Sequence, residues 1–111
     1  MNLISKFIEI TQNLPEKDAI VFDGNRMTFS ELNKRSNQVV SLIFQNAFAK
    51  EDGLIAIQTD DVFQMAATVL GAMKAGHTYM LIDPKWPLNK VKSIVKRVHT
   101  KAFFSWENLS L

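Results

Sequence analysis

The acidic side chains that could do chemistry in this chain stand where apolar runs end. Asp60 and Asp61 precede a helical pattern, so they could form a paired-carboxylate or Mg²⁺ site or cap the helix, and capping is the simpler interpretation. Asp83 follows an apolar run, at a position where α/β proteins bind ligands. Because Pro84 comes next, a turn-forming role for Asp83 is favoured over a place in a ligand crevice.

The two histidines offer weaker signals. His77 follows a helix-terminal glycine, and no Cys, Asp or Glu neighbour lies at metal-ligand spacing, so a loop residue is favoured over an acid, base or ligand. His99 stands beside Arg97 and Lys101 and suits a solvated helix end. The chain has no cysteine, which excludes disulfides and thiolate metal sites.

Motifs that bind phosphate or activate a serine are missing. The four glycines, at positions 24, 53, 71 and 76, are too far apart to form a phosphate cradle. No serine stands in a Gly-x-Ser-x-Gly elbow. We therefore assign no catalytic, cofactor-binding or metal-binding residue to this chain.

Composition places the chain among ordinary globular domains. Its 111 residues are 47% hydrophobic and 22% charged, with a net charge of +2, which predicts one small folded unit. It has no apolar run of membrane-spanning length and no secretory pattern at its N-terminus, so we expect no membrane contact and a cytoplasmic location. Six basic residues follow position 84, and a solvated helix face explains them better than a site for nucleic acid or an acidic partner: Lys85, Lys90, Lys92, Lys96, Arg97 and Lys101.

The first half of the chain predicts two helices joined by a hairpin. An amphipathic stripe favours a helix over 2–14, and the turn signal at Asp23-Gly24 favours a β-hairpin between 19–22 and a short return strand at 26–27. Thr28 and Glu31 match a reciprocal capping box, flanked by Met27 and Leu32 as a hydrophobic staple. A helix over 29–47 should follow, with Leu32, Val39, Val40, Ile43 and Phe44 near one face.

The second half alternates apolar runs with helical stripes. Strands are expected near 54–58, 79–82 and 102–105, with helices over 61–75 and 88–99 between them. This β-α-β-α-β order predicts an α/β fold with a parallel sheet. The helix over 61–75 is apolar almost all round and should be the most buried helix. Its small residues Ala66, Ala67, Gly71 and Ala72 should permit close packing against the sheet.

Two segments resemble core motifs of adenylate-forming (AMP-binding, acyl-CoA synthetase-like) enzymes, and most of all the adenylation domains of nonribosomal peptide synthetases. Residues 27–32, continued by Asn33, Arg35, Ser36 and Asn37, resemble the motif L-T-Y-x-E-L and its N-x-R-A-N extension. Residues 73–84 resemble the motif L-K-A-G-x-A-Y-x-P-I-D-P, with Pro87 at the position of a further proline. Leu81 replaces the family's usual proline, and Asp61, Val62 and Gln64 also depart from the peptide synthetase pattern.

The resemblance implies that residues 1–111 form a single partial domain, the N-terminal portion of an adenylation domain. The whole family uses ATP and Mg²⁺ to convert a carboxylic acid into an acyl-adenylate, and then passes the acyl group to a carrier protein's phosphopantetheine thiol or to coenzyme A. The family's phosphate-binding loop, later nucleotide-binding Asp and catalytic Lys have no counterpart here. A truncated or split adenylation domain, inactive alone and needing no cofactor by itself, is therefore expected.

Two other functions stay open. The chain could be a non-catalytic interaction protein that binds a synthetase partner, or a small α/β ligand-binding module. The edge strand near Phe103-Phe104 favours association, as a homo-oligomer or with a complementing synthetase chain. The opposing expectation is that this edge is covered by Lys101, by residues 106–108 (Trp-Glu-Asn) and by the basic helix. The chain would then be a monomer.

Overall fold

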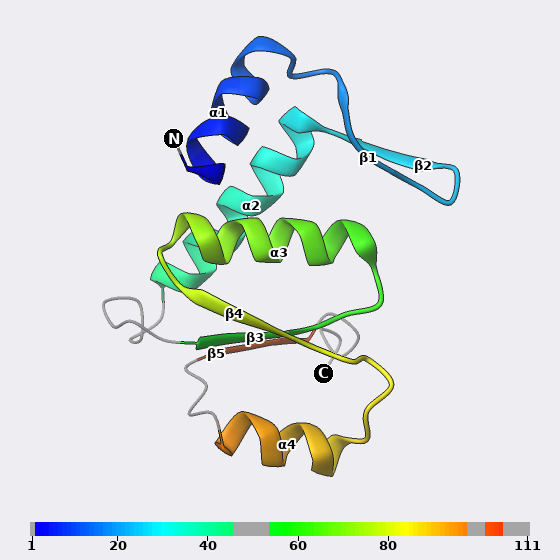
Figure 1. Ribbon diagram of the computed structural model, residues 1–111, viewed down its shortest axis with the longest axis vertical. Coiled ribbons are helices and arrows are strands. Elements are labelled where there is room, and N and C mark those ends of the chain that lie inside the picture. Colours follow the sequence, from blue (N-terminus) through cyan, green and yellow to red (C-terminus); the bar gives the residue numbers. More distant parts are fainter. Residues whose placement is uncertain (1, 46–53, 98–101, 106–111) are drawn as a thin grey trace.

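The described helices lie on both sides of a small parallel sheet (Figure 1). The computed structural model describes residues 2–45, 54–97 and 102–105. Within these ranges no helix is long and apolar enough to cross a membrane. The elements in chain order are α1 (Leu3–Asn13), β1 (Asp18–Phe22), β2 (Asn25–Thr28), α2 (Phe29–Phe44), β3 (Leu54–Gln58), α3 (Val62–Lys74), β4 (Thr78–Ile82), α4 (Leu88–Arg97) and β5 (Ala102–Ser105).

The sheet has the strand order β4-β3-β5, and both pairs are parallel. Ile55 of β3 stands opposite Tyr79 of β4 on one side and Ala102 of β5 on the other. The predicted β-α-β-α-β unit is therefore confirmed. Helices α1, α2 and α3 lie on one side of this sheet, whereas α4 lies alone on the opposite side (Figure 1).

The predicted hairpin is also confirmed. Strands β1 and β2 pair antiparallel as a separate two-stranded sheet. Asp23 and Gly24 have φ values of 51° and 79°, so both central turn residues lie in the left-handed region that a two-residue I′ turn requires.

One half of the predicted capping box forms. The Thr28 hydroxyl accepts a hydrogen bond from the Glu31 amide at 3.1 Å, and Met27 and Leu32 are both buried as the staple predicts. The Glu31 carboxylate turns the other way, because it accepts a hydrogen bond from Arg35 at 2.8 Å. The i,i+4 charge pair thus replaces the reciprocal contact that we predicted for Glu31.

Among the described residues, the core consists of three apolar clusters. The first joins α1, the hairpin, α2 and α3, the second joins α2 and α3 to β3, and the third joins β3 and β4 to α4. Their buried members are Phe7, Met27, Leu32, Ala67 and Leu70 in the first, Val39, Ile43, Ile55, Ile57 and Ala72 in the second, and Ala56, Ile82 and Val91 in the third. Phe44 was predicted near the buried face of α2 but is 57% exposed at the helix end, beyond the apolar cover.

Helix α3 lies at the centre of this arrangement. None of its 13 residues is exposed, so it is the most buried of the described helices, as predicted. Only part of its close packing is against the sheet. A Cβ atom added to Gly71 would lie 2.6 Å from Val39 Cβ and 2.9 Å from the Ser36 carbonyl oxygen, both on α2. The expectation that the small residues of α3 pack against the sheet is therefore wrong for Gly71, which meets α2 where the two helices cross. It is also wrong for Ala66 and Ala67, which pack in the first cluster, whereas Ala72 packs with β3.

The predicted helix ends extend past the described residues in two places. Helix α2 is described to Phe44 and α4 to Arg97, and the remaining predicted turns lie in 46–53 and 98–101, outside the described residues. The suggested cover of Lys101 and residues 106–108 lies outside them as well.

Candidate functional site

The carboxyl edge of the parallel sheet is the candidate site, because α/β proteins bind ligands where parallel strands end. There β3 leads into Thr59, Asp60 and Asp61 before α3, and β4 leads into Asp83. This edge brings the carboxylates selected from the sequence near the start of a helix.

Asp61 caps helix α3. Its Oδ1 atom accepts hydrogen bonds from the amides of Phe63 at 2.8 Å and Gln64 at 3.1 Å. Among the described residues, no group of three or more His, Asp or Glu is placed to hold a metal ion. The capping role predicted for this Asp pair therefore belongs to Asp61.

The polar side chains that precede the Asp61 cap form hydrogen bonds with neighbouring groups. The Thr59 hydroxyl accepts from the Asp61 amide and donates to Gln64 Oε1, each at 3.1 Å. Gln58 Nε2 donates to the Asp83 carbonyl oxygen at 3.1 Å and so ties the end of β3 to the end of β4. Gln58 and Thr59 are only 7% and 2% exposed. Neither residue was predicted as part of a site, although two polar side chains at the end of an apolar run, just before a capping Asp, were a usable signal.

Asp83 forms a turn, as predicted. Its Oδ1 atom accepts from the Lys85 amide at 2.9 Å, and its carbonyl oxygen accepts from the Trp86 amide at 3.2 Å. The side chain is exposed at the edge of the sheet. Asp83 thus begins the connection to α4.

The structure does not bring His77 to this edge. His77 lies between α3 and β4, at the amino end of β4, and is 7% exposed. Its amide donates to the Ala72 carbonyl oxygen at 2.9 Å, after Gly76 with a φ of 80°. The predicted loop position is confirmed, whereas His99 lies outside the described residues.

Lys74 connects the two segments that carry the family resemblance. Its Nζ atom donates hydrogen bonds to three α2 side chains, at 2.5 Å to Asn33 Oδ1, 2.8 Å to Ser36 Oγ and 2.9 Å to Asn37 Oδ1. The same ammonium lies 5.3 Å from the ring centroid of Phe7 on α1. Burial lowers the pKa of Lys74 below its ordinary value. No role was predicted for Lys74, and the available signal was the set of acceptors at i, i+3 and i+4 of α2, Asn33, Ser36 and Asn37.

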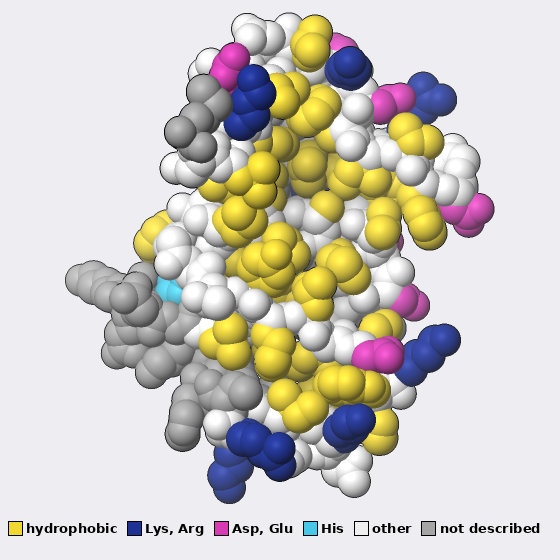
Figure 2. All heavy atoms as spheres, in the orientation of Figure 1, with side chains coloured by type: hydrophobic (Ala, Val, Ile, Leu, Met, Phe, Trp, Pro, Cys, Tyr) yellow, Lys and Arg dark blue, Asp and Glu magenta, His cyan; other side chains and the backbone are white. Residues whose placement is uncertain are grey.

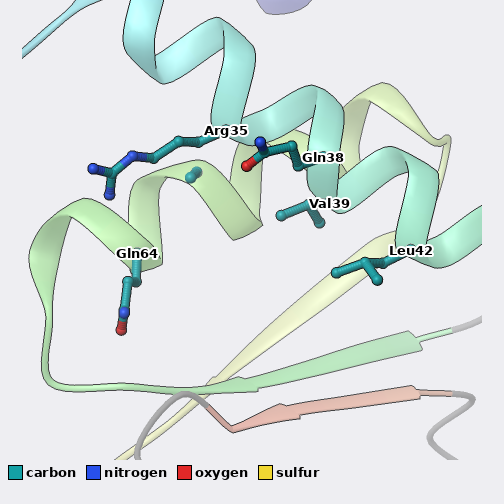
Figure 3. Close-up of a pocket in the computed structure, with 6 residues that line it drawn as sticks. Arg35, Gln38, Val39, Leu42 and Gln64 are labelled. Carbon is teal, nitrogen blue, oxygen red and sulfur yellow. The ribbon is translucent and has the colours of Figure 1, made fainter. Parts of the chain in front are cut away.

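A shallow groove of about 380 Å³ lies between α2 and α3 (Figure 3). Its lining consists of Arg35, Gln38, Val39, Leu42, Gln64 and Ala67. Arg35 is already paired with Glu31, and Gln64 accepts from Thr59. The groove therefore offers no free convergent cluster for acid-base chemistry or phosphate binding.

Comparison with known proteins extends these observations. A family model described as AMP-binding enzyme matches residues 7–110. Bacitracin synthase 2 of Bacillus licheniformis is 33% identical over 90 residues, which make up 81% of this chain and 3% of that protein. The chain thus spans a very small part of the length of this relative.

Two solved structures share the fold. The N-terminal subdomain of Klebsiella oxytoca NpsA aligns with 93% of this chain and 27% of its own, with a TM-score of 0.77 and 21% identity. The nonribosomal peptide synthetase FmoA3, in its alpha-methyl-L-serine-AMP bound form, aligns with 98% of this chain and 12% of its own, with a TM-score of 0.86 and 20% identity. Because the family model covers nearly the whole chain, this protein belongs to the AMP-binding enzyme family, among the adenylation domains of nonribosomal peptide synthetases.

Proposed function

We propose that residues 1–111 form the opening part of an adenylation-domain scaffold and do not catalyse adenylation on their own. The observation that carries this proposal is the Lys74 contact with Asn33, Ser36 and Asn37. Residues of the two family-like segments hold α2 and α3 together there. A structural role for both segments follows.

The described residues do not fit the ATP and Mg²⁺ that the whole family uses. The amino end of α3 is the natural anion site on the candidate edge, but the Asp61 carboxylate already occupies it. A phosphate group there would be repelled by the Asp61 carboxylate, which carries a like charge. The amides of Phe63 and Gln64 would also not be free to bind the phosphate, because they already donate to Asp61. We therefore place nucleotide binding, and transfer to a carrier protein's thiol, in other parts of a complete enzyme.

The isolated chain is expected to give no substrate-dependent exchange of pyrophosphate into ATP. Without a phosphate cradle or a catalytic lysine, nothing stabilises the charge that develops as pyrophosphate leaves. The assay should use a panel of amino and aryl acids, with an intact adenylation domain run in parallel as a positive control. Clear exchange by the pure chain with any acid would overturn the proposal.

A non-catalytic interaction protein is the second candidate function. The observation that favours it is the apolar exposure of β4, where Tyr79 and Leu81 are 39% and 49% exposed. The partner that binds this exposed strand would be a complementing synthetase chain or a second copy of this chain. An intact synthetase gene nearby would favour this candidate, whereas a reading frame that continues into the phosphate-binding loop would favour a split or truncated adenylation domain. Binding of a small ligand by the isolated chain would point instead to a ligand-binding module.

A further inference from the structure

Strand β4 lies at one edge of the parallel sheet. In the strand order β4-β3-β5, β4 pairs with β3 over all five of its residues. No other described strand pairs with it. Within the part of the chain that the structure describes, the outer backbone edge of Thr78–Ile82 therefore pairs with no strand and could form hydrogen bonds to another one.

The side chains of β4 are unequally covered on the two faces of the sheet. Tyr79 and Leu81 stand opposite Ile55 and Ile57, which are 0% and 1% exposed in the cluster with α2 and α3. Since alternate residues of a strand share a face, Tyr79 and Leu81 lie on this same face. Their exposure of 39% and 49% shows that the helices cover β3 but extend only partly over β4.

The opposite face of β4 is closed. Ile82 is 3% exposed and packs in the cluster with Ala56 and Val91, with Met80 and Trp86 against it. Strands of parallel sheets are normally buried on both faces. In β3 and β4, the strands whose side-chain exposure the structure describes, the Tyr79–Leu81 stripe is thus the part that lacks its cover.

Strand β4 also lacks the features that protect a true edge. Exposed edges usually carry charged residues, prolines or bulges, and the sequence Thr-Tyr-Met-Leu-Ile has none, with a regular register throughout. The hairpin shows the contrast, since Arg26 and Asp18 form an ion pair at 3.4 Å and the register shifts between Asp18 and Ile20. This difference favours a β4 edge that another strand covers.

The space-filling view supports the same interpretation. Hydrophobic side chains gather over the middle of the molecule, across α3 and β4, while most charged side chains lie around the rim (Figure 2). A central apolar area with a charged rim is typical of an interface.

We propose that the β4 edge, with Tyr79 and Leu81, binds a β-strand and an apolar cover from the remainder of an adenylation domain. The inference rests on the proposed function. FmoA3 retains this fold over 98% of the present chain, which amounts to only 12% of FmoA3. Most of that longer chain lies outside the matched region, and the corresponding region of an adenylation domain is the source that we propose for the strand and the cover. A second copy of this chain fits less well, because pairing two β4 edges would place a second uncovered Tyr79–Leu81 pair beside the first.

Tyr79 is a selective reporter because it is the only tyrosine in the chain. The full chain labelled with 3-fluorotyrosine should give one ¹⁹F resonance for this position. The binding probe is an adenylation domain of bacitracin synthase 2 that lacks the 90-residue stretch matching this chain. On binding, the resonance should broaden and lose its shift between H₂O and D₂O, and amides of residues 78–82 should become protected from hydrogen exchange.

Leu81→Lys is expected to weaken binding of the probe by about tenfold or more, because it places a charge in the apolar contact. Val21→Lys is the matched control, since Val21 is 66% exposed on β1, away from the sheet edge. It should leave binding unchanged, and circular dichroism should show that both variants are folded.

Each other outcome has a defined meaning. A complex in which Tyr79 and the β4 amides stay exposed would overturn this inference and leave the proposed function standing. Absence of any complex with the wild-type chain would overturn both. Protection of β4 in the chain alone at high concentration, together with a dimer mass in light scattering, would replace the proposed occupant by a second copy.

Discussion

Replacing Gly71 with alanine is expected to lower the free energy of unfolding by about 1–3 kcal/mol, the usual range for an overpacked core. The added methyl group would lie 2.6 Å from Val39 Cβ and 2.9 Å from the Ser36 carbonyl oxygen. Because one of these contacts is with backbone, a side-chain rotation of Val39 cannot relieve it. Helices α2 and α3 would have to separate.

Urea unfolding followed by circular dichroism measures this effect. Comparison of Ser41→Ala with Ser41→Gly, at an exposed position on α2, gives the intrinsic preference of these helices for alanine, expected at about 1 kcal/mol. At Gly71 the change from glycine to alanine should have the opposite sign, so that alanine lowers the free energy of unfolding. If Gly71→Ala stabilised the chain by a similar amount, the close contact between α2 and α3 would be refuted.

The parts of the fold that follow local rules could be predicted from the sequence. The apolar runs over 54–57 and 79–82 and the helical stripes between them are local patterns, so the parallel β-α-β-α-β order followed from them. The caps at Thr28 and Asp61 could be predicted for the same reason, since a cap depends on residues two or three positions away.

Contacts between distant segments could not be predicted in this way. Gly71 was expected to face the sheet, but which face of α3 meets α2 depends on how the two helices cross. The contacts of Lys74 with α2 side chains span 37 to 41 residues. The exposure of Tyr79 and Leu81 likewise depends on how far α2 and α3 extend over the sheet, which strand periodicity does not specify.

The candidate site shows the same division. Asp61 and Asp83 were correctly interpreted as a cap and a turn, because both roles are local. The hydrogen bond from Gln58 to the Asp83 carbonyl oxygen was missed, because it requires β3 and β4 to be neighbours in register. Because these polar groups form hydrogen bonds with one another, the edge connects β3 to β4 and to helix α3 and has a structural role.

Lys74 explains why the two family-like segments carry polar residues at a helix-helix contact. Asn33, Ser36 and Asn37 lie at i, i+3 and i+4 and so present their oxygens on one side of α2. The Ser36 hydroxyl, fully buried, also donates to the Asn33 carbonyl oxygen at 2.8 Å. A lysine at the end of α3 supplies three donors to this set and a positive charge beside the helix carboxyl terminus.

Replacing Lys74 with alanine is expected to lower the free energy of unfolding by about 1–3 kcal/mol at neutral pH, because acceptors at the contact lose their partner. Lys74→Met should cost less, since it keeps the apolar stem beside Phe7 while it removes the ammonium. Lys34→Met, on the exposed side of α2, is the control for loss of a positive charge and should have little effect. If both Lys74 variants had the same free energy of unfolding as the Lys34→Met control, the three hydrogen bonds of Lys74 would contribute nothing to stability.

The pH dependence gives an independent test of the same lysine. Burial lowers the pKa of Lys74 in the folded chain below the ordinary 10.5, so the unfolded chain binds more protons at this group between the two values. Stability contributed by Lys74 should therefore rise with pH through that window and level off above 10.5. The measurement is the difference in unfolding free energy between the wild type and Lys74→Met, from neutral pH to alkaline pH. The difference should shift in favour of the wild type as pH rises, and a constant or falling difference would contradict a desolvated Lys74.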